Sequence, residues 1–320
     1  MLTLNSLLLA GSVLPMLAEP DPSQLGLEPG DRIAVVGNTH AERMQLDGQF
    51  EALLHAAYPD HRLSVRNFGW SGDEVALQPR PLNFIGMDEW LDRHDTDVII
   101  ACFGMNESFG GDEGLAQFQS DLQGWIDAQR QKKYNGTTPP RIVLVSPIAH
   151  EDLGRPLPDG REHNFVLQRY VDTMQKVAAD KNVVFVDLFT PTRESFARGE
   201  GPLTINGIHL NERGYRVTTC AMVDRLGIPL EAGENVDEEG TAIQQHEDLR
   251  QAVLTKNRLF FQRWRPVNTE YVYGRRHEPF GSQNFPDEMK QLDRLIEQAD
   301  QAIWALPPGR PVCVSVEEGY

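Results

Sequence analysis

The run Asn206–His209 places a histidine three residues after a side-chain amide, directly before a stretch with helical spacing at 212–226. A histidine held at a helix start and oriented by a group three positions back can serve as the general base for a nucleophile. Many hydrolases carry a carboxylate where this chain has Asn206. The same residues also fit a helix cap by Asn211 beside a surface histidine. The run alone therefore leaves two interpretations open.

Three further blocks rich in Gly, Asn and hydroxyl residues lie upstream, each at the end of an apolar run. The first contains Asn38 and Thr39, the second contains Ser71 and Gly72, and the third contains Asn106. Any one of these blocks is a weak signal, because short Gly and Asn motifs are common in turns. The order of all four blocks along the chain is more specific.

In this order the blocks resemble those of the SGNH/GDSL hydrolases, a large family of esterases and acylhydrolases. The resemblance covers about residues 30 to 226. It implies that Thr39 is the nucleophile, that His209 is the general base and that Asn206 orients the imidazole. The implied reaction is ester hydrolysis, with no cofactor and no metal. The aromatic and Arg residues at 257–280 suggest that the ester is one of a small molecule or an acylated carbohydrate.

The resemblance also implies an oxyanion hole formed by the backbone N–H groups of Thr39 and Gly72 and the amide of Asn106. Glycine allows close backbone approach to a substrate. A neutral amide donor aimed at developing negative charge stabilises a transition state by roughly 3 kcal/mol. We expect the neighbouring Asn38 and Ser71 to contact the substrate.

Two departures from the family pattern concern the catalytic groups themselves. The family's Gly-Asp-Ser is here Gly37-Asn38-Thr39, so the nucleophile would be a secondary alcohol whose methyl group restricts χ1. The family's Asp-x-x-His is here Asn206-x-x-His209. In a Ser-His-Asp triad the Asp-to-Asn change costs on the order of 10⁴ in turnover, although cysteine proteases use Asn in that place.

Three interpretations of the site therefore stay open. Thr39 attacks the substrate, or a different hydroxyl, Ser71 or Ser108, does so. Alternatively, the site is a catalytically impaired module that binds carbohydrate or ester ligands. We favour hydrolysis. Among the hydroxyls we favour Thr39, because turn formation and capping explain Ser71 and Ser108 more simply than catalysis does.

The elements that would position these blocks alternate between short apolar runs and helical patterns. Apolar runs at 32–36, 63–68, 97–103, 141–146 and 183–188 predict buried strands. Helical spacing occurs at 47–58, 87–94, 113–132 and 163–181. This alternation predicts a three-layer α/β/α sandwich with about five parallel strands in flavodoxin-like order. The blocks fall at the carboxyl ends of the strands, where such folds bind ligands.

The chain is divided by its composition into an arm at 1–29, the hydrolase-like domain at 30–230 and an extension at 231–320. The extension begins with an acidic linker at 231–240, followed by helices rich in aromatic and Arg residues. We expect Arg275 and Arg276 to contact the substrate. The alternative is that these arginines pack the extension onto the acidic domain surface.

Overall composition excludes some classes of partner. The 320-residue chain has a net charge of −17 and a pI near 4.9, which argues against nucleic acid as a partner. The three cysteines show no metal-ligand spacing and indicate no disulfide framework. An apolar stretch before Ala18 fits either a signal peptide or an N-terminal arm, so export and a cytoplasmic location both stay open. No other apolar run could span a bilayer.

Overall fold

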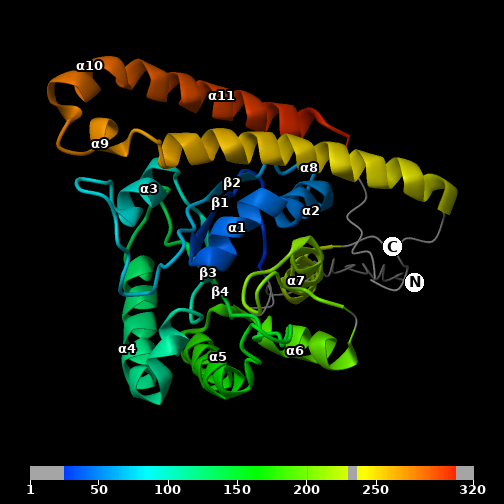
Figure 1. Ribbon diagram of the computed structural model, residues 1–320. Helices are drawn as coiled ribbons and strands as arrows, with labels where there is room; N and C mark the ends of the chain where they lie inside the picture. Colours follow the sequence, from blue (N-terminus) through cyan, green and yellow to red (C-terminus); the bar gives the residue numbers. More distant parts are fainter. Residues whose placement is uncertain (1–24, 200, 230–235, 308–320) are drawn as a thin grey trace, which may run out of the picture.

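The computed structural model describes residues 25–199, 201–229 and 236–307, and it is built around a parallel five-stranded sheet (Figure 1). The strand order is β2-β1-β3-β4-β5, as predicted for a flavodoxin-like sandwich. The strands are β1 (Arg32–Gly37), β2 (Ser64–Asn67), β3 (Val98–Cys102), β4 (Arg141–Val145) and β5 (Val184–Val186). The predicted N-terminal arm lies almost wholly outside the described residues.

Helices cover both faces of the sheet (Figure 1). Helices α1, α2 and α7 pack on one face, and α3, α4 and α5 pack on the other. Consecutive strand residues alternate between the two hydrophobic clusters, so both faces are buried, as the continuous apolar runs predicted. The helices of this part are α1 (Thr39–Asp47), α2 (Gln49–Ala57), α3 (Met87–Arg93), η1 (Glu107–Gly110), α4 (Gly111–Arg130), α5 (Arg161–Lys181), α6 (Phe189–Arg198) and α7 (Glu212–Arg225).

The segment between β1 and β2 forms two helices, where the sequence pattern predicted one at 47–58. Gly48 has a φ of 74° and ends α1 as its C-cap, so the chain turns before α2 begins. Helix α1 starts at Thr39, two residues after the end of β1. This places the candidate nucleophile in the first turn of a helix.

The C-terminal extension is helical and lies beside the β2 edge of the sheet (Figure 1). Its elements are α8 (Val236–Trp264), α9 (Thr269–Val272), η2 (His277–Gly281), α10 (Ser282–Asn284) and α11 (Pro286–Ala305). The predicted linker at 231–240 is too long, because α8 begins at Val236. Helices α8 and α11 pack against each other along their length.

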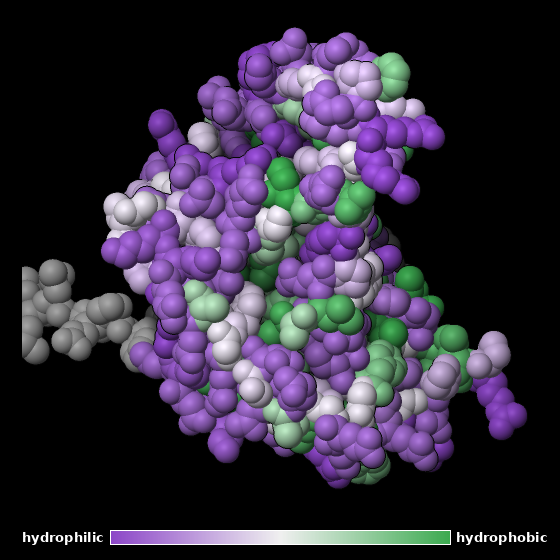
Figure 2. All heavy atoms as spheres, turned by 90° about the vertical axis from the view of Figure 1, so that its left-hand side faces the viewer, coloured by the Kyte–Doolittle hydropathy of each residue, from purple (hydrophilic) through white to green (hydrophobic). Residues whose placement is uncertain are grey.

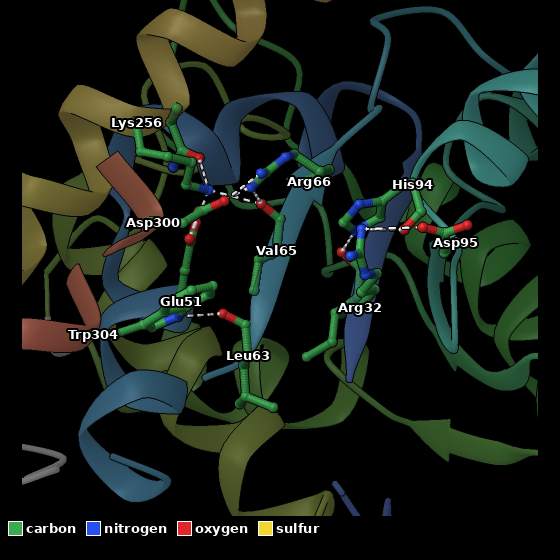
Figure 3. Close-up of polar contacts among 12 residues, drawn as sticks. Arg32, Glu51, Leu63, Val65, Arg66, His94, Asp95, Lys256, Asp300 and Trp304 are labelled. Atoms are coloured by element: carbon green, nitrogen blue, oxygen red, sulfur yellow. Dashed lines mark hydrogen bonds and ion pairs between the residues drawn. The ribbon is translucent and has the colours of Figure 1, made fainter. Parts of the chain in front are cut away.

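Buried polar contacts attach the extension to the edge strand (Figure 3). Lys256 of α8 is fully buried and lies 2.6 Å from the carboxylate of Glu51 and 2.8 Å from the carbonyl of Val65. Asp300 of α11 forms a bidentate ion pair with Arg66 on β2. The extension thereby covers a sheet edge that would otherwise expose unpaired backbone groups.

The molecular surface is mainly hydrophilic, in keeping with the high net charge (Figure 2). It is hollowed below the lobe that the C-terminal helices form. Within the described ranges, no helix is long and apolar enough to cross a membrane. Cys102 is free and buried, whereas Cys220 on α7 is disulfide-bonded, a link that the cysteine spacing had not indicated.

Candidate active site

Residues from three of the four predicted blocks line one small cavity at the carboxyl edge of the sheet. Thr39 follows β1, Asn106 follows β3, and His209 precedes α7. The cavity has a volume of about 30 Å³. Its other lining residues are Asn38, His40, Cys102, Phe103, Met105, Ser146, Pro147, Ile148 and Ile208. The second block, with Gly72, lies beside this cavity but does not line it.

The turn between β1 and α1 is shaped by two residues before the candidate nucleophile. Gly37 has a φ of 123°, and a Cβ there would lie 2.1 Å from the carbonyl oxygen of Cys102. Asn38 is the N-cap of α1, and its Oδ1 accepts a hydrogen bond from the N–H of His40 at 3.0 Å. The side chain of Asn38, which we expected to contact the substrate, is therefore used to start the helix that carries Thr39.

The second block is held against α1 by direct hydrogen bonds. The side chain of Asn67 donates to the carbonyl of Ala41 at 2.7 Å. A Cβ on Gly69 would lie 2.3 Å from the backbone nitrogen of Glu42, so only glycine fits this close approach. Both the backbone N–H and the hydroxyl of Ser71 donate to the Glu42 carboxylate. Ser71 is therefore a positioning residue, because its hydroxyl already donates its hydrogen bond to Glu42.

The third block is joined to the second through Asn106 and Glu107. Asn106 Nδ2 donates to the carbonyl of Asp73 at 3.1 Å, which uses one of its two N–H bonds. The Glu107 carboxylate accepts from the N–H groups of Val75 at 3.0 Å and Gly104 at 2.8 Å. Burial raises the pKa of Glu107 to about 7, against the lowering effect of these hydrogen bonds. The sequence motifs assigned no role to Glu107.

The loop that carries His209 is anchored by a buried carboxylate. Glu151 accepts hydrogen bonds from the N–H groups of Leu203 and Thr204 and from the Thr204 hydroxyl. Asn211 caps α7 by accepting from the N–H of Gly214 at 2.9 Å. The predicted cap and the predicted base are therefore neighbours in one ordered loop.

Asn206 contacts the His209 ring, but through its amide nitrogen. Asn206 Nδ2 lies 2.9 Å from His209 Nδ1, while Asn206 Oδ1 accepts from the backbone N–H groups of His209 at 3.0 Å and Ile208 at 3.4 Å. Backbone N–H groups can only donate, so the amide oxygen must face them and the NH₂ must face the ring. Nδ1 of His209 is therefore an acceptor, and the neutral ring carries its proton on Nε2.

Within the described residues, no hydrogen bond joins the Thr39 hydroxyl to His209, although both line the cavity. Burial, and then the positive charge of Arg43, lower the pKa of His209. His209 is consequently neutral near pH 7. His40, which adjoins Thr39, has a pKa lowered to about 4 by burial, and its ring stacks on Tyr215.

Ser108, the other alternative nucleophile, points away from the cavity. Its hydroxyl lies 2.6 Å from the carbonyl of Met105 and 2.8 Å from Nε2 of His163. His163 in turn lies 3.1 Å from His150, Nδ1 to Nδ1. Ser108 is only 1% exposed, so a substrate in the cavity cannot reach it.

Arg275 and Arg276, expected at the substrate, have local partners within the extension. Arg275 lies 3.4 Å from the carboxylate of Glu270, and Arg276 lies 3.0 Å from the hydroxyl of Tyr271. Neither lines the cavity. A different arginine of the extension, Arg265, reaches the second block.

Arg265, directly after α8, stacks on Trp70 with its guanidinium carbon 3.7 Å from the ring centroid. It also forms an ion pair with Glu42 at 2.8 Å. Because Glu42 also holds Ser71, this carboxylate connects the extension to the second block. The aromatic and Arg composition of the extension was a correct signal, but it did not indicate which arginine is involved.

Comparisons with known proteins agree with the predicted family and fold. The sequence profile described as the GDSL-like Lipase/Acylhydrolase family matches residues 30–217. No curated protein sequence matches. A gut microbial diltiazem-metabolizing enzyme is similar in structure, with a TM-score of 0.59 and 12% identity over 91% of this chain and 98% of that one. An acetylxylan esterase from Geobacillus stearothermophilus, a catalytic mutant, has a TM-score of 0.51 and 15% identity over 66% of this chain and 100% of that one.

Proposed function

The chain belongs to the GDSL-like lipase/acylhydrolase family, and we propose that its site hydrolyses esters of short acyl groups. The observation that carries the proposal is the convergence of Thr39, Asn106 and His209 on one cavity. The cavity has a volume of only about 30 Å³, which suits a short acyl group better than a long chain. The alcohol is a small molecule or a carbohydrate, as in the acetylxylan esterase that shares the fold.

In this proposal the Thr39 hydroxyl attacks the acyl carbonyl carbon, and the carbonyl oxygen becomes an oxyanion. The N–H of Thr39 lies in the first turn of α1, where the helix dipole is positive and favours the negative charge. The second N–H of the Asn106 amide is the further donor. His209 takes the Thr39 proton and delivers it to the leaving alcohol, and water then hydrolyses the acyl-enzyme.

The resting tautomer of His209 makes this proton transfer difficult. A neutral ring with its proton on Nε2 cannot accept another proton there from Thr39. The proton must first move to Nδ1, where it would meet the N–H of Asn206. We therefore expect slow turnover, about 10⁴-fold below that of a site with a carboxylate at position 206.

A second candidate function is binding of the same esters or carbohydrates without turnover. The observation that favours it is that Asn206 presents its amide nitrogen, and not an oxygen, to Nδ1 of His209. Hydrolysis of short-chain p-nitrophenyl esters by the wild type, Thr39→Ala and His209→Ala separates the two functions. Hydrolysis that both substitutions abolish supports the esterase, whereas rates equal to the uncatalysed reaction in all three proteins support the binding module.

A further inference from the structure

A second hollow, distinct from the small cavity, also adjoins the candidate nucleophile. It is a groove of about 570 Å³ between α1 and α8. Its lining residues are Thr39, Glu42, Arg43, Gln45, Leu46, Ser71, Gln251, Leu254, Thr255, Arg258 and Phe261. Thr39 is the one residue that lines both the groove and the small cavity. An ester whose acyl group fills the cavity would thus extend its alcohol into the groove.

We propose that this groove binds the alcohol part of the substrate and selects alcohols that carry a carboxylate next to an apolar ring. This inference rests on the proposed function and deepens it, because it names the class of alcohol. It also assigns a role to α8, which lies outside the segment matched by the family profile.

The selection for negative charge follows from the guanidinium groups of the groove. Arg258 is exposed, and no carboxylate of the described chain pairs with it. The one acidic residue of the lining, Glu42, is already engaged by Arg265 through one carboxylate oxygen and by Ser71 through the other. Arg43 adds a second guanidinium, whose Nε is buried without a hydrogen-bond partner. In a chain of net charge −17, a groove with two uncompensated cations favours an anion.

The preference for a ring beside the carboxylate follows from the apolar part of the lining. Leu46 of α1 is 68% exposed, and it lines the groove together with Leu254 and Phe261 of α8. An exposed leucine at such a place is covered when an apolar ligand face binds, and each Å² removed from water contributes about 25 cal/mol. The guanidinium would bind the carboxylate of a planar aromatic acid, and the apolar wall would contact its ring.

The test compares two acetyl esters that differ by one carboxylate, phenyl acetate and 4-acetoxybenzoate. Their kcat/KM ratio is measured for the wild type, for Arg258→Gln and for the matched control Arg294→Gln, an exposed arginine of α11 that lines neither hollow. We expect Arg258→Gln to lower the ratio of 4-acetoxybenzoate to phenyl acetate about tenfold, as for loss of one hydrogen bond to a charged group. Arg294→Gln should leave the ratio within twofold of the wild type.

A binding measurement separates this inference from the proposed function. Titration calorimetry with 4-hydroxybenzoate, and with phenol as the neutral control, reports occupancy of the groove without any reaction. Binding of 4-hydroxybenzoate that is lost in Arg258→Gln supports the groove even where neither ester is hydrolysed, an outcome in which only the hydrolase proposal fails. A ratio unchanged by Arg258→Gln, or equal binding of phenol and 4-hydroxybenzoate, overturns the inference and leaves ester hydrolysis standing.

Discussion

Replacing Asn206 with aspartate is expected to raise kcat for a short-chain ester by about 10²- to 10⁴-fold. The substitution keeps the side chain isosteric. One carboxylate oxygen continues to accept the backbone N–H groups of His209 and Ile208, which now hold Asn206 Oδ1. The other oxygen replaces the amide NH₂ that lies 2.9 Å from Nδ1 of His209. The ring must then carry its proton on Nδ1, and Nε2 becomes free to accept the proton of Thr39.

The size of the gain comes from the opposite change in a serine-protease triad. There, Asp to Asn costs on the order of 10⁴ in kcat because the imidazole is held in the wrong tautomer. Four powers of ten correspond to about 5.4 kcal/mol of activation free energy. The lower limit of the range allows for Thr39, whose methyl group crowds the attack and which forms no hydrogen bond with the ring in the described structure.

The assay is p-nitrophenyl acetate hydrolysis under saturating conditions, combined with ¹⁵N chemical shifts of the His209 ring. Asn206→Ala is the matched control, because it removes the amide donor without supplying a carboxylate. We expect a shift of the ring proton from Nε2 to Nδ1 in Asn206→Asp alone. A wild-type ring already protonated on Nδ1, or a tautomer change in Asn206→Asp with no gain in kcat, would refute the reasoning.

Two further predictions concern pH and stability. Hydrolysis by the wild type needs neutral His209, whose pKa is lowered, so the acidic limb of the kcat/KM–pH profile should have its midpoint below pH 6.5, the ordinary pKa of histidine. In Asn206→Asp the new negative charge raises that pKa, so a pH–rate profile should show its acidic limb at higher pH. Gly37→Ala should lower the free energy of unfolding by about 3 kcal/mol or more, because its Cβ would meet the carbonyl of Cys102 and its φ is 123°. Urea denaturation checks this, with Gly124→Ala on the open side of α4 as a control that should not be destabilised.

The part of the fold that the sequence predicted correctly depends on local patterns. Each strand is buried on both faces and therefore appears as a continuous apolar run, and the parallel order follows from the helices between the strands. The predicted helix at 47–58 corresponds to α2, which Gly48 separates from α1 by its left-handed backbone. Helix α1 was missed because residues 39–47 are mostly polar and bury only two apolar side chains, Ala41 and Met44.

For the candidate site, the residue types were predictable but their hydrogen-bond directions were not. The three-residue spacing of Asn206 and His209 indicated a contact, and the contact is present. Whether the amide oxygen or nitrogen faces the ring depends on which backbone N–H groups approach Asn206, and a sequence motif does not contain this information. Arg258 and Arg265 were equally hard to single out, because their neighbours on α1 and the second block are more than 180 residues away in the chain.

These long-range contacts make the extension part of the site rather than an appendage to it. Arg265 pairs with Glu42, and Glu42 in turn accepts hydrogen bonds from Ser71. Glu42 and Ser71 both line the groove that adjoins Thr39. The buried pair of Lys256 and Glu51 fixes α8 against the same helical layer. We therefore expect a change in α8 to alter substrate selection without touching any of the four motifs. In our proposal, the cavity for the acyl group lies within the residues that the family profile matches, whereas the groove for the alcohol is completed by α8, beyond them.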